Sequence, residues 1–168
     1  MSNLVKIPFE KLHNGLFHCP FEACFGLMPE LAEIFNSFPS TAQYPRYRYV
    51  VDVKVHMLMP GMWPCIPNWH KDLIPRDVNL TEQPEKINHD VMYAWISGEP
   101  LTEFEYGKIA PRKWIAFTQN DKHRGTQATE HGWRVFIRAV PDTIMKSAPS
   151  KQWLRRQIQV YVEPDFIW

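Results

Sequence analysis

The sequence predicts a mainly β fold of the sandwich or jelly-roll barrel type. Fifteen prolines against seven glycines divide the chain into short pieces, as a fold of many short strands requires. Several of these pieces alternate apolar and polar residues, which is the period of a half-buried strand. The long helical patterns that a doubly wound α/β fold places between its strands are missing from the sequence. At 168 residues, the chain is predicted to form a single domain, 1–168.

The predicted elements run from a short N-terminal helix to a last strand near the C-terminus. Residues 29–38, PELAEIFNSF, predict the helix, because a proline opens the segment and its apolar residues recur on one side. Residues 46–60, RYRYVVDVKVHMLMP, alternate regularly and predict a long strand. Shorter strands are predicted at 90–98, 113–120, 132–140 and 156–164. Residues 81–88 and 143–153 are expected to be loops or single helical turns.

Charge and hydropathy give no reason to expect a nucleic acid or a membrane as the partner. The chain has 19 basic and 18 acidic residues and a net charge of +1, so it carries no electrostatic signal for nucleic acid or for an anionic membrane. Its apolar runs are shorter than the ~20 residues of a membrane-spanning helix. The opening MSNLVKIPFEKL lacks the basic region and apolar block of a secretory signal. We therefore expect a cytoplasmic protein whose partner is a small-molecule substrate.

The three cysteines, Cys19, Cys24 and Cys65, are an odd number and do not indicate a disulfide framework. The C-x4-C spacing of Cys19 and Cys24, with His13 and His18 nearby, is compatible with a zinc site. The phenylalanines around them favour the other interpretation, in which a free cysteine packs as a small core hydrophobe.

The segment PNWHKD, 67–72, holds the first candidate site residues. His70 and Asp72 are separated by one residue, so on an extended segment both side chains leave the same face. Such a pair forms a local hydrogen bond or supplies two ligands to one metal ion. A further histidine, His123, follows the strand predicted at 113–120.

The predicted strand 132–140 presents two different faces. Trp133, Val135, Ile137 and Ala139 form an apolar face, and the opposite face carries Arg134, Phe136, Arg138 and Val140. Arginine is rarely buried without a partner. Two arginines that flank a phenylalanine therefore predict an anionic ligand, unless solvent covers this face.

Taken together, these motifs resemble those of the Fe(II)- and 2-oxoglutarate-dependent dioxygenases. An H-x-D pair is followed some fifty residues later by a distal histidine and, eleven residues beyond it, by an arginine. The stretch HRGTQATEHGWRVFIRA, 123–139, is similar to the corresponding part of the taurine and phytanoyl-type members. The resemblance covers about residues 46–140, and it implies the family's double-stranded β-helix, a jelly-roll, cupin-like core.

Residue by residue, the resemblance assigns roles to five side chains. His70, Asp72 and His123 would be the ligands of Fe(II). Arg134 would receive the far carboxylate of the co-substrate 2-oxoglutarate, and Arg138 would support the same co-substrate. Two imidazoles and one carboxylate on one face of an octahedral ion leave three positions open, and the planar fork of arginine suits a carboxylate.

Alternatives stay open at the level of the sequence. His131 is a second candidate for the distal ligand, although Arg134 follows it after only three residues. A cupin-like metalloprotein would use the three ligands without 2-oxoglutarate and would not need Arg134. A catalytically inactive jelly-roll protein with a binding or assembly role is the third possibility. The chain is short for the dioxygenase family, and no motif identifies a substrate.

Overall fold

The computed structural model describes residues 6–75 and 78–156, which form two antiparallel sheets. The large sheet has the strand order β6-β3-β8-β2-β1-β9, and the small sheet has the order β5-β4-β7. The strands are β1 (Gly15–Pro20), β2 (Tyr49–Leu58), β3 (Met92–Ile96), β4 (Thr102–Phe104), β5 (Gly107–Lys108), β6 (Ile115–Phe117), β7 (His123–Gly125), β8 (Gly132–Pro141) and β9 (Leu154–Arg155).

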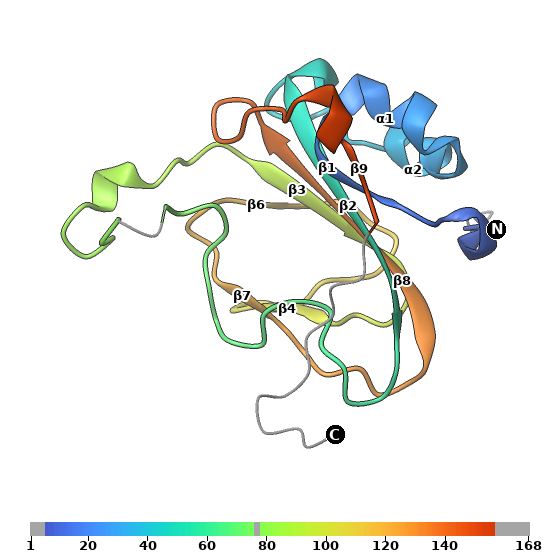
Figure 1. Cartoon of the computed structure of the whole chain (residues 1–168). Helices are drawn as coiled ribbons and strands as arrows, with labels where there is room; N and C mark the ends of the chain where they lie inside the picture. Colours follow the sequence, from blue (N-terminus) through green and yellow to red (C-terminus); the bar gives the residue numbers. More distant parts are fainter. Residues whose placement is uncertain (1–5, 76–77, 157–168) are drawn as a thin grey trace.

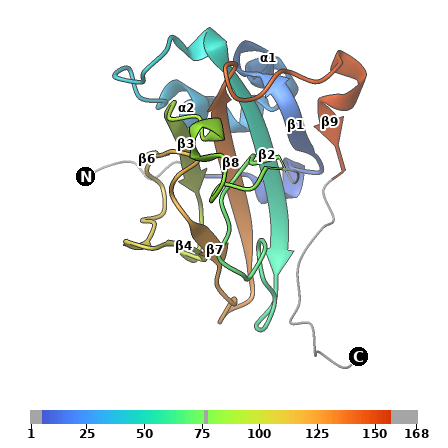
Figure 2. The same cartoon turned by 90° about the vertical axis from the view of Figure 1, so that its left-hand side faces the viewer.

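Two short helices, α1 (Phe21–Leu27) and α2 (Ala32–Asn36), complete the architecture. They cover one face of the large sheet, while the small sheet lies across its opposite face (Figure 1). The view turned by 90° shows β2 and β8 side by side at the centre of the large sheet (Figure 2). Single 3-10 turns lie at Phe9–Lys11, Pro29–Leu31, Arg46–Arg48, Pro84–Lys86 and Ser150–Gln152.

The long strands β2 and β8 build the centre of the fold. They pair in antiparallel register from Tyr49 opposite Pro141 to Leu58 opposite Gly132. Because side chains alternate along a strand, the two strands present an apolar face to the helices. Buried side chains of this face include Val51, Val53, Val55, Val135, Ile137 and Ala139.

Aromatic side chains fill the layer between the helices and the large sheet. Phe38 lies at its centre, with ring centroids 5.0 Å from Tyr49 and 5.1 Å from Tyr93, both in edge-to-face geometry. Phe21 of α1 contacts the same ring at 4.9 Å. Such pairs each contribute ~0.5–1.5 kcal/mol beyond the area that they bury. The N-terminal segment thus covers one face of the large sheet, and the opposite face is available to line a pocket.

The structure confirms the prediction of a mainly β fold. Strands β2, β3 and β6 lie inside the predicted segments 46–60, 90–98 and 113–120, and β8 extends the predicted 132–140 by one residue. The predicted helix 29–38 begins as a 3-10 turn and continues as α2. The strand predicted at 156–164 lies, except for its first residue, outside the described residues.

Several elements were not predicted, namely β1, α1, β4, β5, β7 and β9. The last four have two or three residues each, which is too short to display an alternating pattern. Within 6–75 and 78–156, no helix combines the length and apolarity needed to cross a bilayer.

Candidate metal centre and anion pocket

The two histidines of the predicted site are brought together by the backbone. His70 and His123 form an isolated antiparallel bridge, in which each backbone N–H donates to the other's carbonyl oxygen at 3.0 Å. Residues paired in this way project their side chains from the same face, and the two imidazole centroids lie 4.5 Å apart. Further along the same two segments, Gly125 permits the close approach of its backbone to Cys65, since an added Cβ there would lie 2.7 Å from the carbonyl oxygen of Cys65.

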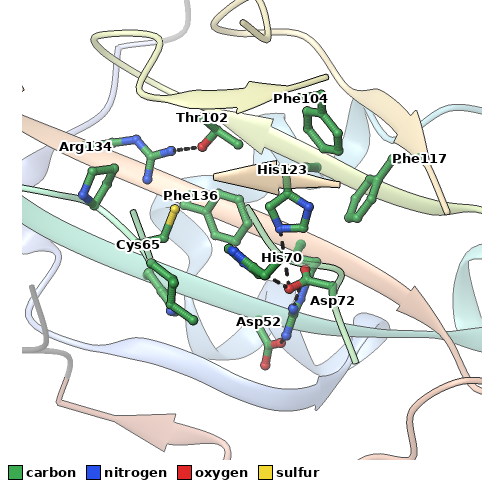
Figure 3. A pocket seen from close by; sticks show the side chains of 15 residues that line it. Asp52, Cys65, His70, Asp72, Thr102, Phe104, Phe117, His123, Arg134 and Phe136 are labelled. Carbon is green, nitrogen blue, oxygen red and sulfur yellow. Dashed lines mark hydrogen bonds and ion pairs between the residues drawn. The ribbon is translucent and has the colours of Figure 1, made fainter. Parts of the chain in front are cut away.

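Asp72 joins the two histidines and completes a candidate metal centre. Its Oδ1 atom lies 3.5 Å from Nε2 of His123 and 3.9 Å from Nε2 of His70. One potential ligand atom from each of the three residues lies within 4.8 Å of the other two. Figure 3 shows the three side chains converging on one point of the pocket. The separations suit a shared ion better than a hydrogen bond between His70 and Asp72.

The other ring nitrogen of each histidine faces a backbone carbonyl. Nδ1 of His70 lies 2.8 Å from the carbonyl oxygen of Asn68, and Nδ1 of His123 lies 3.4 Å from that of Asp121. A carbonyl oxygen can only accept, so this contact favours the tautomer that is protonated at Nδ1. The lone pair of each Nε2 then points toward Asp72 and is available to a metal ion.

Asp72 is held in its ionised form by its surroundings. Burial alone raises the pKa of this carboxyl, but the positive charge and hydrogen bond of the Arg138 guanidinium oppose burial, and the pKa lies well below its usual range. Arg138 donates to Oδ2 of Asp72 at 2.7 Å and to Oδ2 of Asp52 at 2.6 Å. These two carboxylates outweigh burial in turn and raise the pKa of Arg138.

Arg134 is the buried cation at the other end of the pocket. Its residue is 3% exposed, and within the described residues no carboxylate forms an ion pair with it. One terminal nitrogen donates to the hydroxyl of Thr102 at 2.7 Å, while Nε has no hydrogen-bond partner among the described residues. Burial lowers the pKa of this guanidinium to about 10. The sequence left open whether solvent covers the face of β8 that carries Arg134. The burial of Arg134 excludes this for its side chain.

One cavity of about 120 Å³ contains both ends of the site. The metal-ligand candidates lie at one end and Arg134 with Thr102 at the other, with the ring of Phe136 between them (Figure 3). Lys54 also lines the cavity, and no described residue forms an ion pair with its ammonium. Burial and the nearby Arg138 lower the pKa of Lys54. Three cationic side chains therefore line a cavity that contains two carboxylates, those of Asp52 and Asp72.

Next to Arg134, the structure contains a further buried polar group. His56 stands opposite Arg134 in the pairing of β2 with β8, and it is 3% exposed. Within the part of the chain that the structure describes, neither of its ring nitrogens has a hydrogen-bond partner. Burial, with a smaller contribution from Arg134, lowers the pKa of His56 to about 3, so this imidazole is neutral near pH 7.

The structure separates the alternatives that the sequence left open for the ligands. His131 is exposed and lies outside the group formed by His70, Asp72 and His123. Cys19 and Cys24 are fully buried members of the apolar core, and neither belongs to a cluster of potential metal ligands among the described residues. This agrees with the interpretation of these cysteines as core residues.

Three residues of the site were not identified from the sequence. Thr102 lies on β4, a strand too short to be recognised. Asp52 and Lys54 stand on the polar side of β2, which is the side expected to face solvent in an isolated strand. The sequence feature that could have revealed Asp52 and Lys54 is the second strand with a charged face, at 132–140. When two such strands are adjacent in a sheet, their charged faces line the same space.

Comparisons of the chain with protein-family models, curated proteins and solved structures found no match.

Proposed function

We propose that the chain is a non-haem Fe(II)- and 2-oxoglutarate-dependent dioxygenase that hydroxylates a small-molecule substrate. The observation that carries the proposal is the pairing, in one cavity, of a His-Asp-His group with a buried arginine that has no carboxylate partner among residues 6–75 and 78–156. The first feature is a metal site and the second is an anion site. A keto acid with a second carboxylate fits both sites, because its keto acid end can bind the metal ion and its far carboxylate can bind the arginine.

The donor set of the metal site supports iron. Two neutral imidazoles and one carboxylate that approach an ion from one side form the facial triad of non-haem Fe(II) oxygenases. His70, Asp72 and His123 supply these three donors, and the backbone carbonyls at Nδ1 of the histidines fix the ring orientations.

The anion end of the cavity supports a dicarboxylate. Arg134 and the hydroxyl of Thr102 lie side by side, and an unpaired buried guanidinium is costly unless a ligand neutralises it. In the small sheet, Phe104 stands opposite His123 and Thr102 opposite Gly125. This places Thr102 two residues, ~6.8 Å by strand rise, beyond the level of His123. A five-carbon dicarboxylate can bridge a separation of this order.

The strand orders support the double-stranded β-helix that the resemblance implies. Strands β2, β8, β3 and β6 are neighbours in one sheet. In the opposing layer, the bridge at His70 adds a further neighbour to β7, β4 and β5. A six-stranded sheet that faces a three-stranded sheet extended by the bridge at His70, with the site between them, supports a jelly-roll of the cupin type.

Iron held by His70, Asp72 and His123 would supply the chemistry of the family that the chain resembles, in which O2 converts 2-oxoglutarate to succinate and CO2. One oxygen atom of O2 enters succinate, and the other is inserted into a C–H bond of the substrate to give an alcohol. The side chains of the cavity contribute by orienting the co-substrate and by excluding water. Arg134 and Thr102 would orient the co-substrate through its far carboxylate, with two parallel hydrogen bonds from the guanidinium. Phe104, Phe117 and Phe136 line the cavity and limit the access of water.

Calorimetry under anaerobic conditions tests the proposal directly. We expect 2-oxoglutarate to bind the Mn(II)-loaded chain and to lose most of its affinity when the metal is removed, because the keto acid end needs the ion. The Asp72→Ala chain provides the matched control without a metal site. Equal binding of 2-oxoglutarate with and without metal, or no binding to the loaded chain, would refute the proposal.

A further inference from the structure

Arg138 bridges two carboxylates at the inner face of the large sheet. Its two terminal nitrogens donate to Asp72 at 2.7 Å and to Asp52 at 2.6 Å. Asp52 stands directly opposite Arg138 in the pairing of β2 with β8, and it is 5% exposed. Because the guanidinium is planar and rigid, this contact fixes the position of Asp72 relative to the sheet.

The far side of Asp52 is fixed as well. Its Oδ1 accepts the backbone N–H of His18 at 2.8 Å. His18 has a φ of 43°, a left-handed conformation that non-glycine residues adopt only when the surroundings impose it. It lies where the register of β1 against β2 shifts between Leu16 and Cys19. The backbone N–H of His18, in this strained conformation, therefore fixes the carboxylate of Asp52, and Asp52 in turn fixes Arg138.

The two oxygens of Asp72 have different environments. Oδ2 receives Arg138, whereas Oδ1 is the oxygen that lies 3.5 Å and 3.9 Å from the Nε2 atoms of His123 and His70. Carboxylates bind metal ions through one oxygen or through both. Binding through both would require Oδ2 to leave or share its hydrogen bond with Arg138.

We propose that Arg138, anchored by Asp52, is a positioning residue that restricts Asp72 to a single metal-binding oxygen. The inference rests on the metal site of the proposed function and extends it to residues that do not touch the metal. Three protein donors then leave three of six octahedral positions open, two for a keto acid and one for O2. A carboxylate bound through both oxygens would leave two.

The second carboxylate preserves the charge of the ligand. Arg138 with Asp72 alone would be a neutral pair, but the trio with Asp52 carries one net negative charge. Asp72 can therefore be held by a cation and still present negative charge to a divalent ion. Arg138 then acts on the metal ligand, whereas the resemblance implied that it supports the co-substrate.

The test counts the water ligands of bound Mn(II) by water-proton relaxivity, with the full chain and without 2-oxoglutarate. We expect three waters in the parent and two in Arg138→Met, so that relaxivity per bound ion falls by about one-third, while Mn(II) is retained. Arg138→Lys keeps the charge but not the two-pronged contact, so its relaxivity should fall too. Arg48→Met is the matched control, because Arg48 pairs with Asp142 and neither residue lines the cavity.

The possible outcomes separate this inference from the proposed function. Unchanged relaxivity in a folded Arg138→Met chain overturns the inference, and so does unchanged relaxivity in Arg138→Lys if the methionine variant fails to fold. Loss of Mn(II) from Arg138→Met also overturns it, because Asp72 would then need Arg138 simply to bind. A parent that holds Mn(II) with three waters but does not bind 2-oxoglutarate refutes the dioxygenase alone. A parent that binds no Mn(II) removes both.

Discussion

Replacing Arg134 by alanine should abolish tight binding of 2-oxoglutarate and leave the metal site intact. Arg134 is buried, donates to Thr102 and has no carboxylate partner among the described residues. A bound carboxylate would form a charge-assisted, desolvated pair with it, and truncating one partner of such a pair costs ~2–5 kcal/mol. At ~1.4 kcal/mol per decade, the dissociation constant should rise by roughly thirty-fold or more.

Anaerobic calorimetry on the Mn(II)-loaded chain provides the measurement, and the ligand supplies the control. The keto acid 2-oxobutanoate retains the metal-binding end but lacks the far carboxylate. It should bind the parent and Arg134→Ala about equally, so that the affinity loss appears only with 2-oxoglutarate. Such a cycle isolates the contact between the guanidinium and the far carboxylate. Arg134→Lys should recover part of the loss, because an ammonium cannot form the bidentate fork.

The reasoning fails if the parent and Arg134→Ala bind 2-oxoglutarate with the same affinity. It also fails if 2-oxobutanoate loses as much affinity as 2-oxoglutarate, because the effect would then not involve the far carboxylate. The first result would favour the cupin-like metalloprotein that does not use a keto acid.

Three further predictions concern the metal, the cost of the anion site and pH. Asp72→Ala should lose Mn(II) binding in calorimetry, because it removes the anionic ligand; a variant that binds as tightly as the parent would place the site elsewhere. Arg134→Met should raise the free energy of unfolding of the metal-free chain by roughly 1–3 kcal/mol, measured by urea denaturation at pH 7. The reason is that burial lowers the pKa of Arg134 to about 10 and no carboxylate of the described residues compensates its charge. An unchanged or lower free energy of unfolding would contradict this. The pKa of His56 is lowered to about 3, so between pH 6.5 and 3 the unfolded chain binds a proton that the folded chain does not. Stability is therefore lost as pH falls through this window. Between pH 7 and 5 the parent should lose roughly 2 kcal/mol more than His56→Leu, and equal losses would show that His56 is not the group responsible.

How far the sequence predicted the fold depends on strand length. The ten residues of β2 and of β8 display several alternating periods, so the pattern predicted both strands and the common face of Arg134 and Arg138, but left open whether solvent covers that face. The small sheet could not be predicted, because its strands have two or three residues. It is the pairing of β4 with β7 that fixes the position of Thr102.

The same distinction applies to the site. The motif identified His70, Asp72 and His123, but their meeting depends on one backbone bridge between residues far apart in sequence. The contact between Asp52 and Arg138 depends on the register of β2 against β8. The alternating pattern excludes a shift by one residue, which would turn the apolar side chains to the opposite face. A shift by two residues keeps every face and changes the partner of each side chain, so the pattern does not specify that Asp52 stands opposite Arg138.

Anaerobic visible absorption of the Fe(II)-loaded chain tests the central claim most directly. The claim is that His70, Asp72 and His123 hold iron while Arg134 directs the keto acid onto it. We expect a weak charge-transfer band when both Fe(II) and 2-oxoglutarate are present, no band with either alone, and no band in Asp72→Ala. A folded parent that binds Fe(II) yet shows no band at saturating 2-oxoglutarate would contradict the claim.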